Sequence, residues 1–150
     1  MSALLEAATI ATAAGAGLVG GVFLAFSVMV MPALAALPPA HGLAAMRRIN
    51  ELAVSTVFIA VFLLTAVGAA GLLVAGFTAG GTRVTLPLGA ASYLLGAFGL
   101  TLAYNVPRND RLGHDDAFWT TYLREWTAAN HVRGLFALGA TVLLASAVAA

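Results

Sequence analysis

The side chains best suited to bind a polar group in this sequence are a few amides and one arginine beside uncharged stretches. Asn130 and Arg133 lie three residues apart, and Asn105 and Asn50 lie at the ends of two other apolar stretches. An Arg in a membrane normally faces the protein interior and takes a partner, and an Asn side chain gains nothing from lipid. We therefore predict one polar site built from three helices. The competing interpretation is a hydrogen-bonded latch that fastens the helices without chemistry.

Aromatic side chains accompany this set. Trp119, Tyr122, Trp126, Asn130 and Arg133 follow steps of three, four, four and three residues, so a helix places all five on one face. This face predicts the wall of a site inside the bundle. For Trp119 and Tyr122 an interfacial belt is the equal alternative, because Trp and Tyr are enriched at the headgroups.

A second candidate wall lies in the first apolar stretch. Phe23, Ser27 and Met31 share one helical face, with Phe26 and Val30 beside it. Aromatic and Met side chains with one hydroxyl suit the wall of a pocket for a flat hydrophobic ligand. Simple packing is the alternative.

Several kinds of chemistry are excluded or disfavoured. The chain has no Cys, so it forms no disulfide, no thiolate metal site and no thiol nucleophile. His41, His114 and His131 lack the spacing of a metal motif, and we predict no metal site. A net charge of +1 gives no basic excess for nucleic acid.

The elements that must position these residues follow from composition. The chain is 61% hydrophobic and 9% charged, whereas a soluble domain carries about 25% charged residues. Uncharged runs long enough for spans of about 20 residues predict a single transmembrane domain over residues 1–150. We expect an all-α, integral membrane, four-helix up-down-up-down bundle, and the first span should remain in the mature protein. The predicted spans are about 7–34, 50–77, 84–106 and 127–149.

The Arg residues predict an orientation, because basic residues in short connections stay in the cytoplasm. The first connection contains Arg47 and Arg48, the second only Arg83, and the third, roughly residues 106–125, contains Arg108, Arg111 and Arg124. We expect a multi-pass protein of the plasma membrane. Both termini should be extracytoplasmic, and the first and third connections cytoplasmic.

Small residues recur every four positions in the first span, at Ala13, Gly17, Gly21 and Ala25. Such a stripe lets helix backbones approach closely in lipid. We expect it to face a neighbouring helix.

Four pieces of the sequence together resemble a known family. They are residues 21–32 (GVFLAFSVMVMP), residues 46–50 (MRRIN), residues 105–109 (NVPRN) with Leu112, and the set Trp119, Trp126, Asn130, His131, Val132 and Arg133. In this order, on a four-span chain, they resemble the anthrone oxygenase-like integral membrane proteins over nearly the whole length. One departure is Arg47, where the family often has Gln.

The resemblance implies a cofactor-independent monooxygenase that converts an anthrone-like polyketide to a quinone with O2. Its partners would be a small hydrophobic substrate, O2 and the lipid bilayer. The catalytic residues would be His131, Arg133, Asn130 and Asn105, with Asn130, Asn105 and Arg133 donating to the anionic oxygen. His131 or Asp110 would be the base, and His131 is preferred because imidazole exchanges a proton near neutral pH. Substrate contacts would come from Asn50, Asn109, Trp119, Trp126, Phe23, Phe26 and Ser27.

Two other functions compete with this one. The first is a non-catalytic membrane scaffold or accessory protein, in which the Asn, Arg and Trp cluster only fastens the helices. The second is a transporter, which we favour less because no acidic residue lies in the middle of a span to couple ions. The sequence leaves homo-oligomerisation open.

Overall fold

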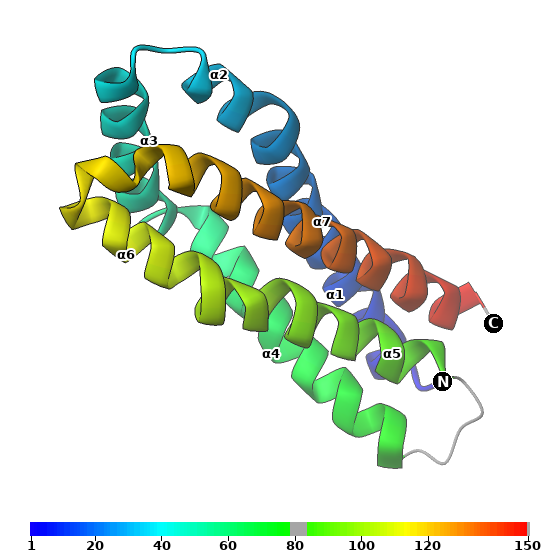
Figure 1. Cartoon of the computed structure of the whole chain (residues 1–150). Coiled ribbons are helices and arrows are strands. Elements are labelled where there is room, and N and C mark those ends of the chain that lie inside the picture. The colour runs from blue at the N-terminus through cyan, green and yellow to red at the C-terminus, as the bar shows by residue number, and fades with distance from the viewer. Residues whose placement is uncertain (79–83, 150) are drawn as a thin grey trace.

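The computed structural model describes residues 1–78 and 84–149, which form four antiparallel helical runs (Figure 1). The runs are Ala3–Ala35, Val57–Thr78, Thr85–His114 and Asp116–Ala149, and each is long and apolar enough to cross a membrane. The predicted all-α four-helix bundle is confirmed. Arg83 and the connection around it lie outside the described residues.

Three of these runs contain turns that are not α-helical. The first comprises α1 (Ala3–Ala25), the π-helical η1 (Phe26–Val30) and α2 (Met31–Ala35). The second is α4 (Val57–Thr78). The third comprises α5 (Thr85–Ala91), the π-helical η2 (Ser92–Gly99) and η3 (Thr101–Asn105), and α6 (Val106–His114). The 3-10 turn η4 (Asp116–Phe118) leads into α7 (Trp119–Ala149).

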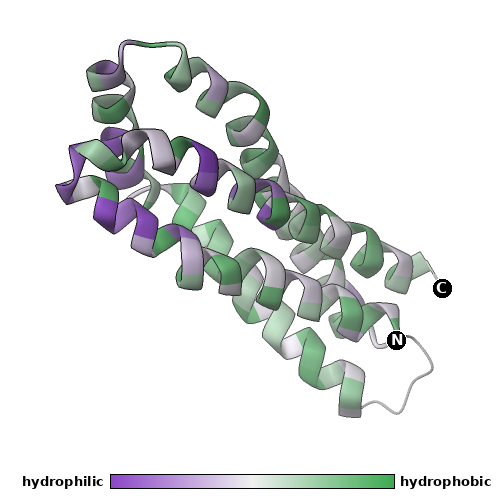
Figure 2. Ribbon diagram, viewed as in Figure 1, coloured by the Kyte–Doolittle hydropathy of each residue, from purple (hydrophilic) through white to green (hydrophobic). Residues whose placement is uncertain are grey.

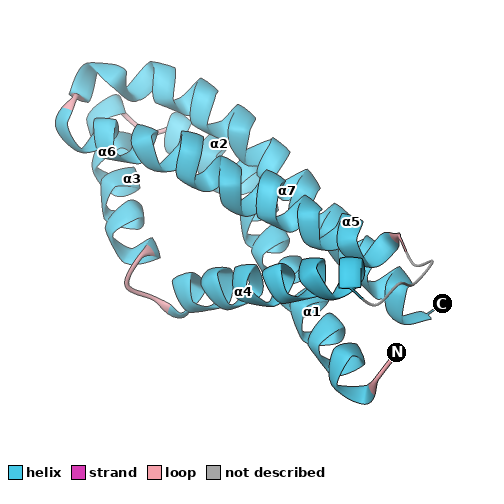
Figure 3. Cartoon of the chain, turned by 90° about the horizontal axis from the view of Figure 1, so that it is seen from below, coloured by secondary structure: helices cyan, strands magenta, loops and turns pink. Residues whose placement is uncertain are grey.

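The first connection differs from the sequence expectation, because it contains a separate helix, α3 (Pro39–Ala53), that crosses the end of the bundle (Figures 1 and 3). Pro39 opens α3, where its missing N–H costs nothing. Leu43 and Met46 are buried, whereas Arg48 on the same helix is exposed. This amphipathic pattern places α3 at the end of the bundle, so the second span begins at Val57 rather than near residue 50.

The third connection is also more helical than expected. Of residues 106–125, only Asp115 lies outside a helical turn. A helix of 31 residues such as α7 is about 46 Å long, against a hydrocarbon thickness of about 30 Å. The third and fourth helices therefore continue past the apolar layer at the end that carries α3. We call this the polar end, where hydrophilic residues gather (Figure 2).

Each end of the bundle has its own hydrophobic core. One core joins small and apolar residues of α1, α4, α5 and α7, including Val19, Ala69 and Leu144. The other lies at the polar end and joins Met31 and Met46 to a set of aromatic residues. The aromatic members of this second core are Phe118, Trp119, Tyr122 and Trp126.

Glycines allow the close approach of α1 to its neighbours, on a face that includes only part of the predicted stripe: Ala13 is buried and Gly17 faces Thr141. A methyl group added at Gly20 would lie 2.9 Å from the Leu138 side chain, and Gly15 faces Thr65. Gly21 is exposed, with open space around it. The expected stripe was therefore wrong at Gly21, and the packed face is centred on Gly15, Val19 and Gly20.

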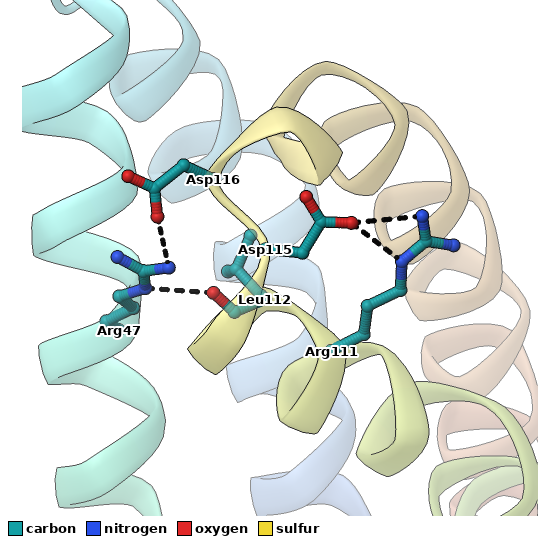
Figure 4. Close-up of polar contacts among 5 residues, drawn as sticks. All are labelled: Arg47, Arg111, Leu112, Asp115 and Asp116. Atoms are coloured by element: carbon teal, nitrogen blue, oxygen red, sulfur yellow. Dashed lines mark hydrogen bonds and ion pairs between the residues drawn. The ribbon is translucent and has the colours of Figure 1, made fainter.

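Arginine side chains fasten the polar end together (Figure 4). Arg47 of α3 donates to the Leu112 carbonyl at 2.8 Å and pairs with Asp116 at 2.6 Å. The Leu112 carbonyl belongs to the last turn of α6, where carbonyls lack helical partners. Arg111 pairs with Asp115 at 3.1 Å. The bonds of Arg47 hold α3 against the turn between α6 and α7, and the Arg111–Asp115 pair lies within that turn.

Candidate functional site

Asn130 is the centre of the buried polar cluster. It has no exposed surface, and its amide nitrogen donates to the Phe23 carbonyl at 2.6 Å and to the Ser27 hydroxyl at 2.7 Å. Its amide oxygen accepts from Arg133 at 2.6 Å. An amide offers two N–H groups and one carbonyl, so both hydrogens are used. Two donors toward the first helical run and one acceptor toward Arg133 also fix which way the amide points.

Arg133 lies beside Asn130 and is only 4% exposed. One terminal nitrogen donates to Asn130, and the other donates to the Thr101 hydroxyl at 3.1 Å. The guanidinium carbon lies 4.2 Å from the centre of the Phe23 ring and 5.1 Å from that of Trp126. Aromatic faces attract a cation. Neutral oxygens and π faces therefore stabilise this buried charge.

No acidic residue neutralises Arg133 within the described part of the chain, where the ion pairs involve Arg47, Arg48, Arg108 and Arg111. Its Nε–H is buried without a hydrogen-bond partner. A buried cation without an opposite charge is costly. The site is therefore short of one negative charge.

Two further buried groups near this cation also lack partners. The Trp126 indole N–H has none, and neither has the Asn105 side-chain oxygen. The Asn105 amide nitrogen donates to the Trp126 carbonyl at 3.4 Å, which places Asn105 against α7. Buried polar groups in proteins are normally hydrogen-bonded. The cluster therefore offers two unused donors and one unused acceptor.

The polar residues that the first and third helical runs supply to this cluster all lie in π-helical turns. Ser27 belongs to η1, and Thr101 and Asn105 are the first and last residues of η3. A π-turn widens the helix, because each N–H bonds to the carbonyl five residues earlier, and such turns are frequent at functional sites. The N–H of Val106, for example, bonds to the Thr101 carbonyl.

Aromatic rings extend from the cluster in both directions. Toward the apolar core, Phe23 meets Phe58 and Phe62 edge to face at 6.2 and 6.4 Å. Toward the polar end, Trp126 stacks on Tyr122 at 5.9 Å, and Tyr122 stacks on Trp119 at 6.0 Å. Phe26 lies 6.0 Å from Trp126. The polar groups are therefore enclosed between two aromatic series.

A second polar group connects the aromatic series to the polar end. The Tyr122 hydroxyl is buried and donates to the Asn109 side-chain oxygen at 2.8 Å, and the Asn50 side chain lies near the same hydroxyl. Asn50 and Asn109 are half-buried. Both predicted residues thus lie around Tyr122, one aromatic layer away from Arg133.

Two candidate bases lie outside the cluster. The side chain of His131 is exposed, although its neighbour Asn130 is buried, because successive residues of an α-helix point about 100° apart. Asp110 is exposed on α6.

Trp119 is buried at the far end of the aromatic series, where Gly42 of α3 packs on its ring.

Thr101 is a cluster residue absent from the predicted site, and Tyr122 was predicted as a wall or belt residue but not as a substrate contact. Tyr122 shares the face of α7 that contains Trp126, so its helical spacing was a usable signal. Thr101 lies four residues before Asn105, which puts the two on adjacent turns. A threonine in an apolar run is common, however, and only the bond from Arg133 distinguishes it.

Comparison with known proteins gives one family. The family model described as anthrone oxygenase matches residues 46–143, which include Asn105, Asn130 and Arg133 but not Phe23 or Ser27. No curated protein and no solved structure matches the chain. The match covers well over half of the sequence and contains most of the buried cluster. The chain belongs to the anthrone oxygenase family.

Proposed function

We propose that this protein is a cofactor-independent membrane monooxygenase that oxidises a flat, anthrone-like ketone with O2 to a quinone. The observation that carries the proposal is the buried Arg133, which contacts two aromatic faces and, among the described residues, has no acidic partner and no partner for its Nε–H. Such a group is suited to an aromatic anion. Membership of the anthrone oxygenase family supports the same substrate class.

The reaction requires little beyond the stabilisation of an anion. Loss of one proton from the CH2 group of an anthrone gives a delocalised anion, with much of its charge on the carbonyl oxygen. This anion transfers an electron to O2, and the two radicals combine to form a C–O bond. The peroxide anion that results takes back one proton and becomes a hydroperoxide. The resulting hydroperoxide loses water, and its carbon becomes the second carbonyl. One anthrone and one O2 thus give one quinone and one water.

The buried cluster would act on the anion. The Nε–H of Arg133 and the indole N–H of Trp126 would donate to the enolate oxygen, and Asn105 would accept from a hydroxyl on the substrate. Fixed donors in a water-poor site stabilise a developing oxyanion far better than water does. Phe23 and Trp126 would lie against the aromatic rings, so that the anion forms where water is scarce.

We further propose that the polar end faces the cytoplasm and that the protein resides in the plasma membrane. Arg47, Arg48, Arg108, Arg111 and Arg124 all belong to helices at this end, and basic residues near span ends are retained in the cytoplasm. The substrate would then reach the cluster from the bilayer or from the cytoplasmic side.

The test is anthrone oxidation by the purified full-length protein in detergent, measured by an oxygen electrode and by quinone absorbance. Anthrones oxidise slowly on their own, so empty micelles and heat-denatured protein set the background. We expect a rate at least tenfold above background, one O2 consumed per quinone, label from 18O2 in the quinone, and no effect of metal chelators. A rate equal to background would contradict the proposal and favour the scaffold.

His131 can be tested separately as the base. Because its side chain is exposed on the face of α7 away from the cluster, we expect His131→Gln to retain the rate of anthrone oxidation within about threefold. The measurement is kcat from pH 6 to 9. A loss of 100-fold or more, confined to kcat, would show that His131 removes the substrate proton after all.

A further inference from the structure

Thr101 forms an unusual pair of hydrogen bonds for a threonine in an apolar helix. Its hydroxyl donates to the Ala97 carbonyl at 2.6 Å and accepts from the terminal nitrogen of Arg133 at 3.1 Å. A hydroxyl has a single hydrogen. Because Ala97 takes that hydrogen, Thr101 can offer Arg133 only a lone pair, and it is therefore a fixed acceptor.

The guanidinium is held at both of its terminal nitrogens. Thr101 of η3 binds one, and Asn130 of α7 binds the other. A planar fork held at two corners cannot rotate in its own plane, and its direction decides where the remaining Nε–H points. Phe23 and Trp126 restrict the tilt of the plane. The aromatic rings limit the tilt of the guanidinium, and Asn130 holds only one of its corners. Thr101 holds the second corner and thus prevents rotation of the guanidinium in its own plane.

We propose that Thr101 is a positioning residue of the oxidation reaction, which aims the Arg133 guanidinium at the enolate oxygen of the substrate. The inference rests on the proposed function, since it assumes that Arg133 stabilises the anion. Thr101 itself need not touch the substrate. Thr101 should affect two quantities: the rate of the chemical step and the pKa of the CH2 group of the bound anthrone.

Thr141 provides a matched control. Its hydroxyl donates to the Ala137 carbonyl at 3.0 Å, the same bond to the fourth preceding residue. Within the described residues no side chain donates to Thr141. Thr101 and Thr141 are both half-buried. Replacing either with Val removes the bond from its hydroxyl to the carbonyl four residues earlier. Only Thr101→Val also removes an acceptor from Arg133.

The experiment compares the kinetics of Thr101→Val, Thr101→Ser and Thr141→Val with the parent. We expect Thr101→Val to lower kcat about tenfold, which corresponds to one hydrogen bond to a charged group, with KM within about twofold. Thr101→Ser keeps the acceptor and should restore kcat to within about threefold, and Thr141→Val should match the parent. If Thr101→Val does not fold, kcat is compared between Thr101→Ser, which keeps the acceptor, and Thr101→Ala, which lacks it.

A second measurement follows the anion directly. Without O2, the bound anthrone can be titrated by the long-wavelength absorbance of its anion. We expect Thr101→Val to shift half-ionisation about one pH unit higher, whereas Thr141→Val should not shift it.

Three results would overturn the inference: parental kcat and ionisation in Thr101→Val, equal losses in Thr101→Ser and Thr101→Val, or equal losses in Thr101→Val and Thr141→Val. A parent enzyme that does not oxidise anthrones would instead refute the proposed function itself.

Discussion

Arg133→Lys should lower the rate of anthrone oxidation by about 100-fold or more, the cost of removing a central oxyanion donor, while the bundle stays folded. Lys keeps the positive charge but has one nitrogen in place of three, and it cannot bind in a planar fork. Its three N–H groups radiate from one nitrogen, so they cannot reproduce the separate positions of the two terminal nitrogens and the Nε of Arg133. The loss should appear in kcat, because the anion exists only during the reaction.

The matched control for this change is Arg124→Lys, on the same helix but exposed. It should retain the parental rate and the parental melting temperature. Both variants are compared by kcat, by KM and by gel filtration in detergent. If Arg133→Lys turned over at the parental rate, the guanidinium would have no part in the chemistry, and the cluster would be a latch.

The sequence predicted the buried face of α7 because that helix is regular. Trp119, Trp126, Asn130 and Arg133 follow helical spacing, and all four are buried. An uninterrupted helix of 31 residues preserves this spacing, so face and depth could be deduced from residue numbers. The four spans follow from composition in the same way, because a long uncharged run has few other structures available in a membrane.

The first and third helical runs were harder to predict because they contain π-turns. Each π-turn alters the rotation that follows it. The predicted face of Phe23, Ser27 and Met31 nevertheless holds across the first π-turn, because all three side chains are buried. Nothing in the apolar letters of these runs marks a wider turn. Spacing from Phe23 placed Ser27 on the buried face, whereas the contact of Thr101 with Arg133 is a long-range bond that only the folded chain reveals.

The amphipathic α3 was missed for a different reason. Membrane spans are predicted from long apolar runs, whereas residues 39–53 mix Leu43 and Met46 with charged side chains. The segment was therefore divided between a turn and the start of the second span. Leu43, Met46 and Ile49 recur at steps of three residues, which is the spacing of an apolar helix face and would have identified the helix.

Asn130→Leu should destabilise the folded bundle and abolish most activity. The substitution keeps the branched shape of the side chain but removes two donors toward the first helical run and the acceptor of Arg133. Hydrogen bonds between membrane helices average about 0.6 kcal/mol and reach about 1.7 kcal/mol. Two such bonds, together with a buried cation that loses a partner, give an expected loss of about 2 to 3 kcal/mol in the free energy of unfolding.

The measurement is thermal unfolding in detergent, with two further variants. Ser27→Ala removes one of the bonds and should cost about 0.6 kcal/mol. His131→Leu replaces the exposed neighbour of Asn130 and should change the free energy of unfolding by less than about 0.5 kcal/mol. In the Asn130→Leu background Ser27→Ala should cost almost nothing, because the bond is already lost. Full additivity of the two losses would contradict the assigned hydrogen bond.

Stability and activity of the same variants separate the two roles of the cluster. Ser27→Ala weakens the link between the first helical run and α7 but leaves the bond from Arg133 to Asn130 intact, so it should retain most of the activity. Asn130→Leu weakens the link and also releases one corner of the guanidinium, so at a temperature where it is fully folded its kcat should still fall more than tenfold. If the cluster only fastened the helices, both variants would regain full activity under conditions in which they are folded. A loss of kcat that persists in folded Asn130→Leu is therefore the result that distinguishes chemistry from fastening.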